Sequence, residues 1–282
     1  FDYLDHSKWW HEVTMSGGGN NEFQWYVNDR FNSYTFGGVL NIVPTFTSDI
    51  LGNGFLVSGR VVIPEWECTD SRNDGCVRRG TPDSIINPIQ SARIDTRESF
   101  HFKYGRVEIR AKMPGGDWLW PSFWMMPKHN VYGDWPRSGT ITIVEGRGNR
   151  ALYNENSHVG TERVTSTLHF GPAWNFNGWQ KTHGGFNQSP GSNEGFRNYE
   201  FIWDPSYLQF WVDGNLILSV DVNDVFWYKD DFWNSGYENP WSGRPASAPF
   251  DQEFYLIMNL AVGGTNGYFA DSFDNRNGGK PW

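Results

Sequence analysis

The chain has 282 residues, 38% hydrophobic and 20% charged, which is typical of a soluble globular protein with one large core. The formal net charge of −9 disfavours nucleic acid as a partner, because a polyanion would be repelled. No run approaches the length of about 18 uninterrupted apolar residues, so we expect no membrane-spanning segment and no membrane partner.

Strand signals dominate the chain, as short runs of β-branched and aromatic residues alternate with Gly, Pro and Asp. The predicted strands cover residues 38–46, 55–63, 103–113, 197–205, 208–222 and 253–264. Between the apolar runs of the fifth segment, Asp213–Gly214 predicts a two-residue β-hairpin turn. Helical spacing of apolar residues is nowhere sustained for three turns. We therefore predict an all-β fold of packed antiparallel sheets, in one domain spanning residues 1–282.

Cys68 and Cys76 lie in ECTDSRNDGC, a polar stretch in which a buried free thiol would be out of place. We predict a disulfide that closes a short loop, worth about 2.5 kcal/mol in the chain-entropy model. A disulfide indicates an oxidising compartment, so we expect a secreted, extracellular protein; two unrelated free thiols are the alternative. The chain begins at Phe1 with no signal-like apolar segment, so we expect a mature or excised form.

Aromatic residues make up 17% of the chain, with 16 Trp, 12 Tyr and 21 Phe. The flat apolar face and polar edge of Trp and Tyr suit a sugar ring as well as they suit a protein core. Composition alone therefore leaves carbohydrate binding and ordinary core packing both open.

The segment Gln90–Asn149 reads QSARIDTRESFHFKYGRVEIRAKMPGGDWLWPSFWMMPKHNVYGDWPRSGTITIVEGRGN. It resembles the laminarinase-like members of glycoside hydrolase family 16, which include endo-β-1,3-glucanases and the β-1,3-glucan-binding proteins of invertebrates. Supporting segments are GGGNNEFQWY (17–26), INPIQSAR (86–93), STLHFGP (166–172), FIWDPSYLQFWVDG (201–214) and MNLAVGGTNGYF (258–269). The resemblance implies a jelly-roll β-sandwich of two curved antiparallel sheets, concanavalin A-like, with β-1,3-glucan lying across the concave face.

The same resemblance implies that the last strand of the family is missing beyond Trp282. It implies no required cofactor and no metal held by side chains, and it leaves a structural calcium ion bound by backbone oxygens possible.

The family's catalytic strand follows the pattern Glu-x-Asp-x-x-Glu: a nucleophile, an Asp that tunes it, and a general acid/base. In SGTITIVEGRG, Thr140 stands at the nucleophile position and Thr142 at the Asp position, and only Glu145 keeps its carboxylate. Alternate strand residues share a face, so a β-bulge near Ile143–Val144 is needed to bring Glu145 to the face of the threonines. Retaining hydrolysis requires two carboxyl groups about 5–5.5 Å apart, so we expect no hydrolysis.

Further positions are candidates for contact with the glucan. Trp118 and Trp120 are alternate residues, and the resemblance implies that at least one of them lines the cleft, whereas Trp124 is expected in the core. His169 points either toward the sugar or into the interior. Two more candidates match family positions near the negative subsites: Asn20 and Arg93.

Three functions remain open at this point. The first is β-1,3-glucan binding on an inactive hydrolase scaffold, as in invertebrate defence. The second is an active retaining endo-β-1,3-glucanase whose Glu and Asp at positions 140 and 142 are mutated or misassigned. The third is a structural protein without sugar binding. Mass spectrometry across residues 138–150 separates the second from the others, and titration with laminarin oligosaccharides separates the first from the third.

Overall fold

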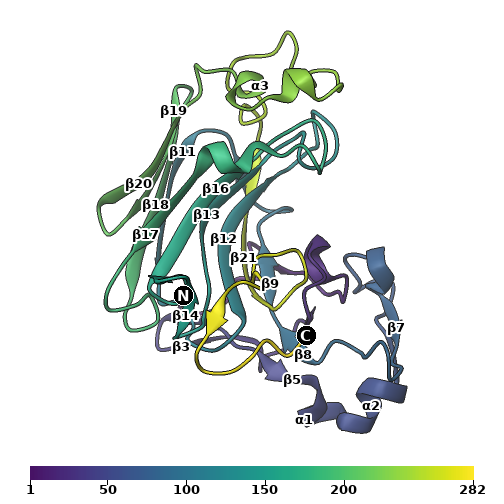
Figure 1. Ribbon diagram of the computed structural model, residues 1–282. Helices are drawn as coiled ribbons and strands as arrows, with labels where there is room; N and C mark the ends of the chain where they lie inside the picture. Colours follow the sequence, from purple (N-terminus) through teal and green to yellow (C-terminus); the bar gives the residue numbers. More distant parts are fainter.

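The protein, as a computed structural model that describes residues 1–282, consists of two stacked antiparallel sheets with smaller sheets and short helices around them (Figure 1). The larger sheet has eight strands, of which seven lie in the order β1 (Trp10–His11), β9 (Arg93–Asp95), β21 (Phe254–Val262), β12 (Leu119–Pro127), β13 (Thr140–Gly146), β16 (Arg163–His169) and β17 (His183–Asn187), while β10 (His101–Phe102) pairs with β21. The smaller sheet has four strands, in the order β11 (Gly105–Ala111), β18 (Arg197–Trp203), β19 (Tyr207–Val212) and β20 (Asn215–Asp221). The predicted all-β sandwich is confirmed.

Short elements surround the sandwich. One three-stranded sheet contains β2 (Gln24–Tyr26), β8 (Ile89–Ser91) and β5 (Thr45–Phe46), and another contains β15 (Ser157–His158), β14 (Leu152–Asn154) and β22 (Asp274–Asn275). Two hairpins pair β3 (Ser33–Phe36) with β4 (Val39–Ile42) and β6 (Arg60–Val62) with β7 (Val77–Arg79). The α-helices are α1 (Thr47–Leu51), α2 (Asn53–Ser58) and α3 (Phe226–Lys229), and the 3-10 helices are η1 (Gly17–Gly19), η2 (Arg72–Asp74), η3 (Gly178–Thr182) and η4 (Phe232–Asn234). None of the helices has the length and apolar composition that a membrane-spanning helix requires.

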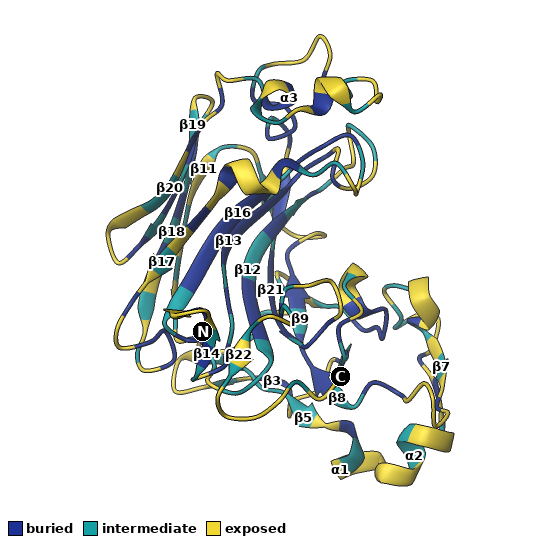
Figure 2. Cartoon of the chain, in the orientation of Figure 1, coloured by how far each residue is buried: buried dark blue, intermediate teal, exposed yellow.

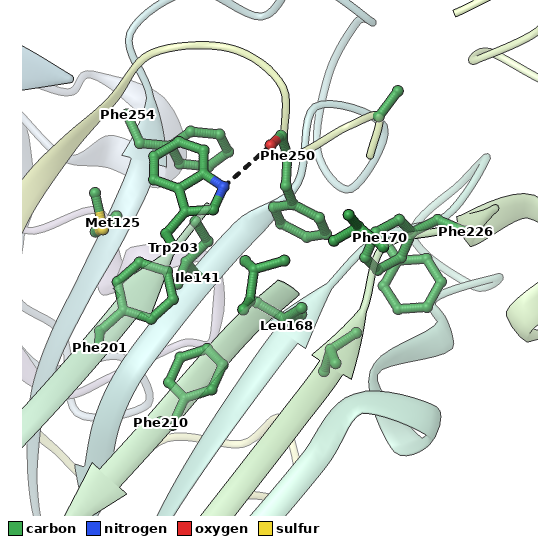
Figure 3. Close-up of a cluster of buried hydrophobic side chains, with 14 of the residues drawn as sticks. Met125, Ile141, Leu168, Phe170, Phe201, Trp203, Phe210, Phe226, Phe250 and Phe254 are labelled. Atoms are coloured by element: carbon green, nitrogen blue, oxygen red, sulfur yellow. Dashed lines mark hydrogen bonds between the residues drawn. The ribbon is translucent and has the colours of Figure 1, made fainter. Parts of the chain in front are cut away.

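The main hydrophobic core lies between the two stacked sheets (Figure 3). Trp203 of β18 and Phe210 of β19 meet Ile141 of β13 and Leu168 of β16, and all four side chains are almost completely buried. Because Ile141 and Leu168 point into this core, the residues that alternate with them in β13 and β16 point to the opposite side of the larger sheet.

Most of the predicted strands are confirmed. Strands β11, β18 and β21 lie within three of the predicted segments, and segment 38–46 contains the two shorter strands β4 and β5. The hairpin predicted within segment 208–222 is formed by β19 and β20. At its turn Asp213 and Gly214 have φ angles of 47° and 78°, the left-handed conformation that a type I′ turn requires.

The strand predicted over residues 55–63 is wrong in its first half. Residues Asn53–Ser58 form helix α2, and only Arg60–Val62 forms a strand. The side chains of Phe55 and Leu56 pack from this helix onto a second, smaller buried cluster. This tertiary packing outweighs the strand propensity of the sequence FLVS, since β-propensity depends strongly on context.

Cys68 and Cys76 form the predicted disulfide, with their Cα atoms 5.7 Å apart. The disulfide closes the loop that leads into β7. Figure 2 shows that β7, α1 and α2 are largely exposed and lie to one side of the stacked sheets, whereas β13 and β16 are mostly buried.

Candidate functional site

Strand β13 contains the β-bulge predicted near Ile143–Val144. Thr142 pairs with Trp124 of β12, and Glu145 pairs with Ser122, so three steps along β13 match two steps along β12. The register of β13 against β16 shifts in the same way. The extra residue returns Glu145 to the side of the sheet that carries Thr142, so the predicted bulge is confirmed.

We call this side the open face, because it is the face of the larger sheet that points away from the main core. The registers between strands bring together side chains from five neighbouring strands, from β9 to β16: Arg93, Asn259, Ser122, Trp124, Glu145, Thr142, Thr140, Thr165, Thr167 and His169. Hydroxyl, amide, indole, imidazole and guanidinium groups thus lie side by side with the Glu145 carboxylate. This set suits hydrogen bonding to a neutral ligand with many hydroxyl groups.

Thr140 and Thr142 are buried among the other side chains of the open face, and these residues are only 4% and 6% exposed. The Thr140 hydroxyl donates its proton to the carbonyl oxygen of Gly139 at 3.0 Å, and a carbonyl oxygen is too weak a base to activate it as a nucleophile. The predicted replacement of two carboxylates by two hydroxyls therefore occurs on the same face as the remaining Glu145.

Glu145 is held by an aromatic neighbour. The Trp120 indole Nε1 donates to Glu145 Oε2 at 3.0 Å, and burial raises the pKa of this carboxyl group, with opposing contributions from Trp120 and Arg147. A carboxyl with a raised pKa is suited to act as a general acid, but acid catalysis of retaining hydrolysis also needs a second carboxylate.

One face of the Trp120 ring is covered by a stacked aromatic ring. Its indole is 8% exposed and stacks on the Tyr268 ring, with ring centroids 3.8 Å apart and planes inclined by 7°. The Arg147 guanidinium lies 4.0 Å from the centre of the Tyr268 ring and donates to the Tyr268 carbonyl oxygen at 2.8 and 3.0 Å. Sequence reasoning missed Tyr268 and Arg147, because both lie outside any periodic pattern that would single them out.

Trp118 precedes β12 with a φ angle of 67° and is only half-buried. Its ring packs on Phe269 at 5.5 Å and on Trp282 at 5.2 Å. Phe269 also contacts Trp120, so the predicted Trp pair does share one side of the sheet. Stacking of a sugar on either ring stays a prediction.

The placement of Trp124 in the core is wrong. Its neighbour Met125 enters the core, so Trp124 points to the open face, where its Nε1 donates to Asn259 Oδ1 at 2.7 Å. The Arg93 guanidinium lies 4.7 Å from the centre of the Trp124 ring and forms an ion pair with Glu12, with Nε and Oε1 3.0 Å apart. The sequence WPSFWMMP is apolar on both faces, so alternation alone did not show which side is the core.

Asn20 lies beside a buried carboxylate that the sequence analysis did not single out. Asn20 Nδ2 donates to Glu22 Oε1 at 2.8 Å, and Gln24 Nε2 donates to Glu22 Oε2 at 2.6 Å. The Tyr26 hydroxyl lies 3.4 Å from Glu22 Oε2 and accepts from Asn259 Nδ2 at 2.9 Å, which links this cluster to the open face. The alternation of Glu22, Gln24 and Tyr26 is the sequence pattern that could have predicted this cluster around Glu22.

His169 pairs with Thr140 across β13 and β16 and lies on the open face, where it is half-buried. Its Nδ1 accepts from Asn177 Nδ2 at 3.0 Å, and the Trp135 ring lies 5.8 Å away. Burial lowers the pKa of His169 to about 4, so the imidazole is neutral at pH 7. A sugar-facing role for His169 stays a prediction.

We expect His169 to make the folded protein more sensitive to acid. Between the folded pKa of about 4 and the ordinary value of about 6.5, the unfolded chain binds a proton that the folded chain excludes, so stability falls as the pH falls through this window. Urea unfolding midpoints at pH 7 and pH 4.5 should therefore differ less for His169→Gln than for the wild type. The same change at the exposed His129 is the control, and equal pH sensitivity of all three proteins would contradict a buried neutral imidazole.

No group of three or more His, Cys, Asp or Glu side chains is arranged to hold a metal ion. A calcium ion bound by backbone oxygens would not need such a group, so it stays a prediction.

The family model of glycosyl hydrolases family 16 matches residues 66–234, which is more than half of the chain. The chain belongs to glycosyl hydrolases family 16. The recognition of a laminarinase-like family 16 chain from its central segment is thereby confirmed.

The relatives of this family 16 chain include a protein named for glucan binding and a protein named for glucan hydrolysis. It is 46% identical to a β-1,3-glucan-binding protein of Penaeus monodon, in a match that covers 100% of this chain and 76% of that protein. It is 31% identical to a glucan endo-1,3-β-glucosidase of Cryptopygus antarcticus, covering 95% of this chain and 78% of that one. Among solved structures, the laminarinase from Rhodothermus marinus matches with a TM-score of 0.63 and 27% identity, over 94% of this chain and 83% of that chain.

Proposed function

We propose that this protein binds β-1,3-glucan on its open face and does not hydrolyse it. The observation that carries this proposal is the set of side chains beside the bulge. Thr140 and Thr142 occupy the positions of the family's nucleophile and its neighbouring Asp, and Glu145 is the one carboxylate of the three. A retaining mechanism needs a second carboxyl group about 5–5.5 Å away, and a threonine hydroxyl bonded to a carbonyl oxygen does not replace it.

The rest of the open face supports binding. Its hydroxyl, amide and indole groups are fixed by hydrogen bonds within the protein, such as those that join Trp124 to Asn259 and Trp120 to Glu145. Groups held in this way lose little conformational freedom when a ligand binds. The Penaeus monodon relative named as a β-1,3-glucan-binding protein supports the choice of ligand.

The Cys68–Cys76 disulfide supports a secreted protein, because disulfides persist in oxidising compartments. A role in invertebrate defence forms part of the proposal and rests on the resemblance of the central segment to the β-1,3-glucan-binding proteins of invertebrates.

The purified protein should release no reducing ends from laminarin above background, yet it should bind laminari-oligosaccharides with micromolar to millimolar affinity, on the order of −4 to −8 kcal/mol. Reducing-sugar assays and isothermal titration measure the two properties on one preparation, with a laminarinase as the positive control for hydrolysis. Turnover that persists through further purification, with Thr140 confirmed by mass spectrometry, would contradict the absence of hydrolysis. A folded protein without measurable affinity would contradict glucan binding.

A further inference from the structure

A pocket of about 650 Å³ lies beyond the end of the open face, where β12 begins and β21 ends. Trp118 lines it from the start of β12, and Val262 lines it from the end of β21. The other walls come from the N-terminal segment, the disulfide-closed loop and the chain end at Trp282. Its volume is in the range of small-molecule sites in proteins.

Three aromatic rings form the apolar wall of the pocket. Trp282 packs edge-on against Phe23, with ring centroids 4.9 Å apart, and edge-on against Trp118 at 5.2 Å. All three side chains line the pocket. Such rings can cover the apolar C–H face of a sugar while their edges stay in contact with one another.

A buried carboxylate forms part of the polar wall. Glu22 is 9% exposed and accepts hydrogen bonds from Asn20, Gln24 and the Tyr26 hydroxyl, which leaves about one lone pair free for a further donor. The backbone at Gly18 has a φ of +60° and passes so close that a Cβ there would lie 2.6 Å from Glu22 Oε1. A Cβ at this position would therefore push the carboxylate away from where its hydrogen bonds to Asn20 and Gln24 hold it.

Amide and guanidinium groups also belong to the polar lining of the pocket. Asn87 donates to the Gln24 carbonyl oxygen at 2.9 Å and also accepts a bond from Arg78, whose second Nη donates to the Asn73 carbonyl oxygen at 2.6 Å. Asn73, Arg78 and Asn87 all line the pocket. Two carboxylates, Glu22 and Asp117, line the pocket together with one guanidinium, Arg78, so an anionic sugar would be disfavoured and a neutral one fits the charge.

The pocket is connected to the open face by direct contacts. The ring of Trp118 packs on Phe269, which packs on Trp120 beside Glu145. On the other side, Glu22 reaches Asn259 of the open face through the Tyr26 hydroxyl. These contacts place the pocket next to the open face.

We propose that this pocket binds a terminal β-glucosyl unit of the glucan, either the end of the chain or a single-glucose side branch. The proposal rests on glucan binding by the open face. Aromatic faces for the C–H surface and fixed amide and carboxylate groups for the hydroxyls are the chemistry that recognises a neutral pyranose. A terminal unit fits the placement of the pocket at one end of the open face, where β12 begins and β21 ends.

The test compares wild-type protein with Trp282→Ala by titration with two oligosaccharides: linear laminarihexaose, and the same hexamer carrying one 6-linked glucosyl branch. Trp282→Ala removes one aromatic wall, and Ile85→Trp narrows the pocket from its rim, where Ile85 is 42% exposed. Each variant should bind about tenfold more weakly, the scale of one well-packed aromatic contact. Trp66→Ala is the matched control, because Trp66 is 85% exposed and does not line the pocket.

The oligosaccharides that lose affinity show whether the bound glucosyl unit is a chain end or a side branch. Weaker binding of both oligosaccharides by the pocket variants indicates the chain end, and weaker binding of the branched one alone indicates the side branch. Unchanged affinities for both, in variants whose melting temperature matches the wild type, would overturn the proposal for the pocket while leaving glucan binding intact. Wild-type protein that binds neither oligosaccharide would instead overturn the proposed function.

Discussion

The double change Thr140→Glu, Thr142→Asp should produce endo-β-1,3-glucanase activity at least about 10²-fold above background, the lower scale of positioned acid–base catalysis. Glu145 already lies on the same face as both positions, and burial raises its pKa, which favours the protonated form that a general acid needs. The two threonine side chains are short and buried in the open face. The longer Glu side chain at position 140 would therefore reach further toward a bound sugar than the threonine does. An Asp at position 142 would stand between the two glutamates and, when protonated, donate a hydrogen bond that stabilises the ionised nucleophile.

Hydrolysis of laminarin, with the product anomer followed by proton NMR, measures this result, and the configuration should be retained. Thr140→Gln with Thr142→Asn is the matched control, since it has a similar shape without charge and should stay inactive. Thr140→Glu alone should recover less activity than the double change. A double variant that folds and binds laminari-oligosaccharides but stays inactive would show that the open face differs from a catalytic one at further positions.

Trp203→Ala should lower the free energy of unfolding by about 3–5 kcal/mol, the usual cost of deleting a buried aromatic side chain. Trp203 is 1% exposed, and its ring packs edge-on against Tyr104 at 5.3 Å and Phe254 at 5.6 Å. Its Nε1 also donates to the Phe250 carbonyl oxygen at 3.2 Å, which would lose its partner. Urea unfolding followed by circular dichroism measures the difference.

Trp66→Ala serves as the control for this measurement, because its exposed side chain should contribute no more than about 0.5 kcal/mol. A loss below about 1 kcal/mol for Trp203→Ala would mean that the core between the sheets relaxes around the missing ring.

The parts of the fold that sequence reasoning predicted are those with strong local signals. Period-two alternation in β11 and the Asp213–Gly214 turn depend on neighbouring residues only, and both are confirmed. The bulge in β13 was also predicted, because strict alternation would have turned Glu145 toward the core. Helix α2 was missed because its stability comes from packing against residues far away in the sequence.

The candidate site was predicted less completely than the fold, for a physical reason. The positions in β13 follow from a motif, but their surroundings depend on contacts between distant segments. Tyr268 covers Trp120 from a loop near the end of the chain, and Trp124 turns to the open face inside a run that is apolar on both sides. Neither arrangement can be predicted from the residues that are neighbours in the sequence.

The extra residue in β13 also determines which mutations of this strand keep Glu145 on the open face during evolution. The side on which Glu145 lies is determined by the backbone of the bulge and not by which residues occupy positions 140 and 142. Codon substitutions at those two positions can therefore exchange hydroxyl for carboxylate with the strand registers intact. If β13 kept all its residues but paired as a regular strand without the bulge, Glu145 would instead turn into the apolar core, where a carboxylate is costly. Evolution between a receptor and an enzyme on this scaffold can therefore proceed by substitutions at positions 140 and 142, as long as the backbone bulge keeps Glu145 on the open face.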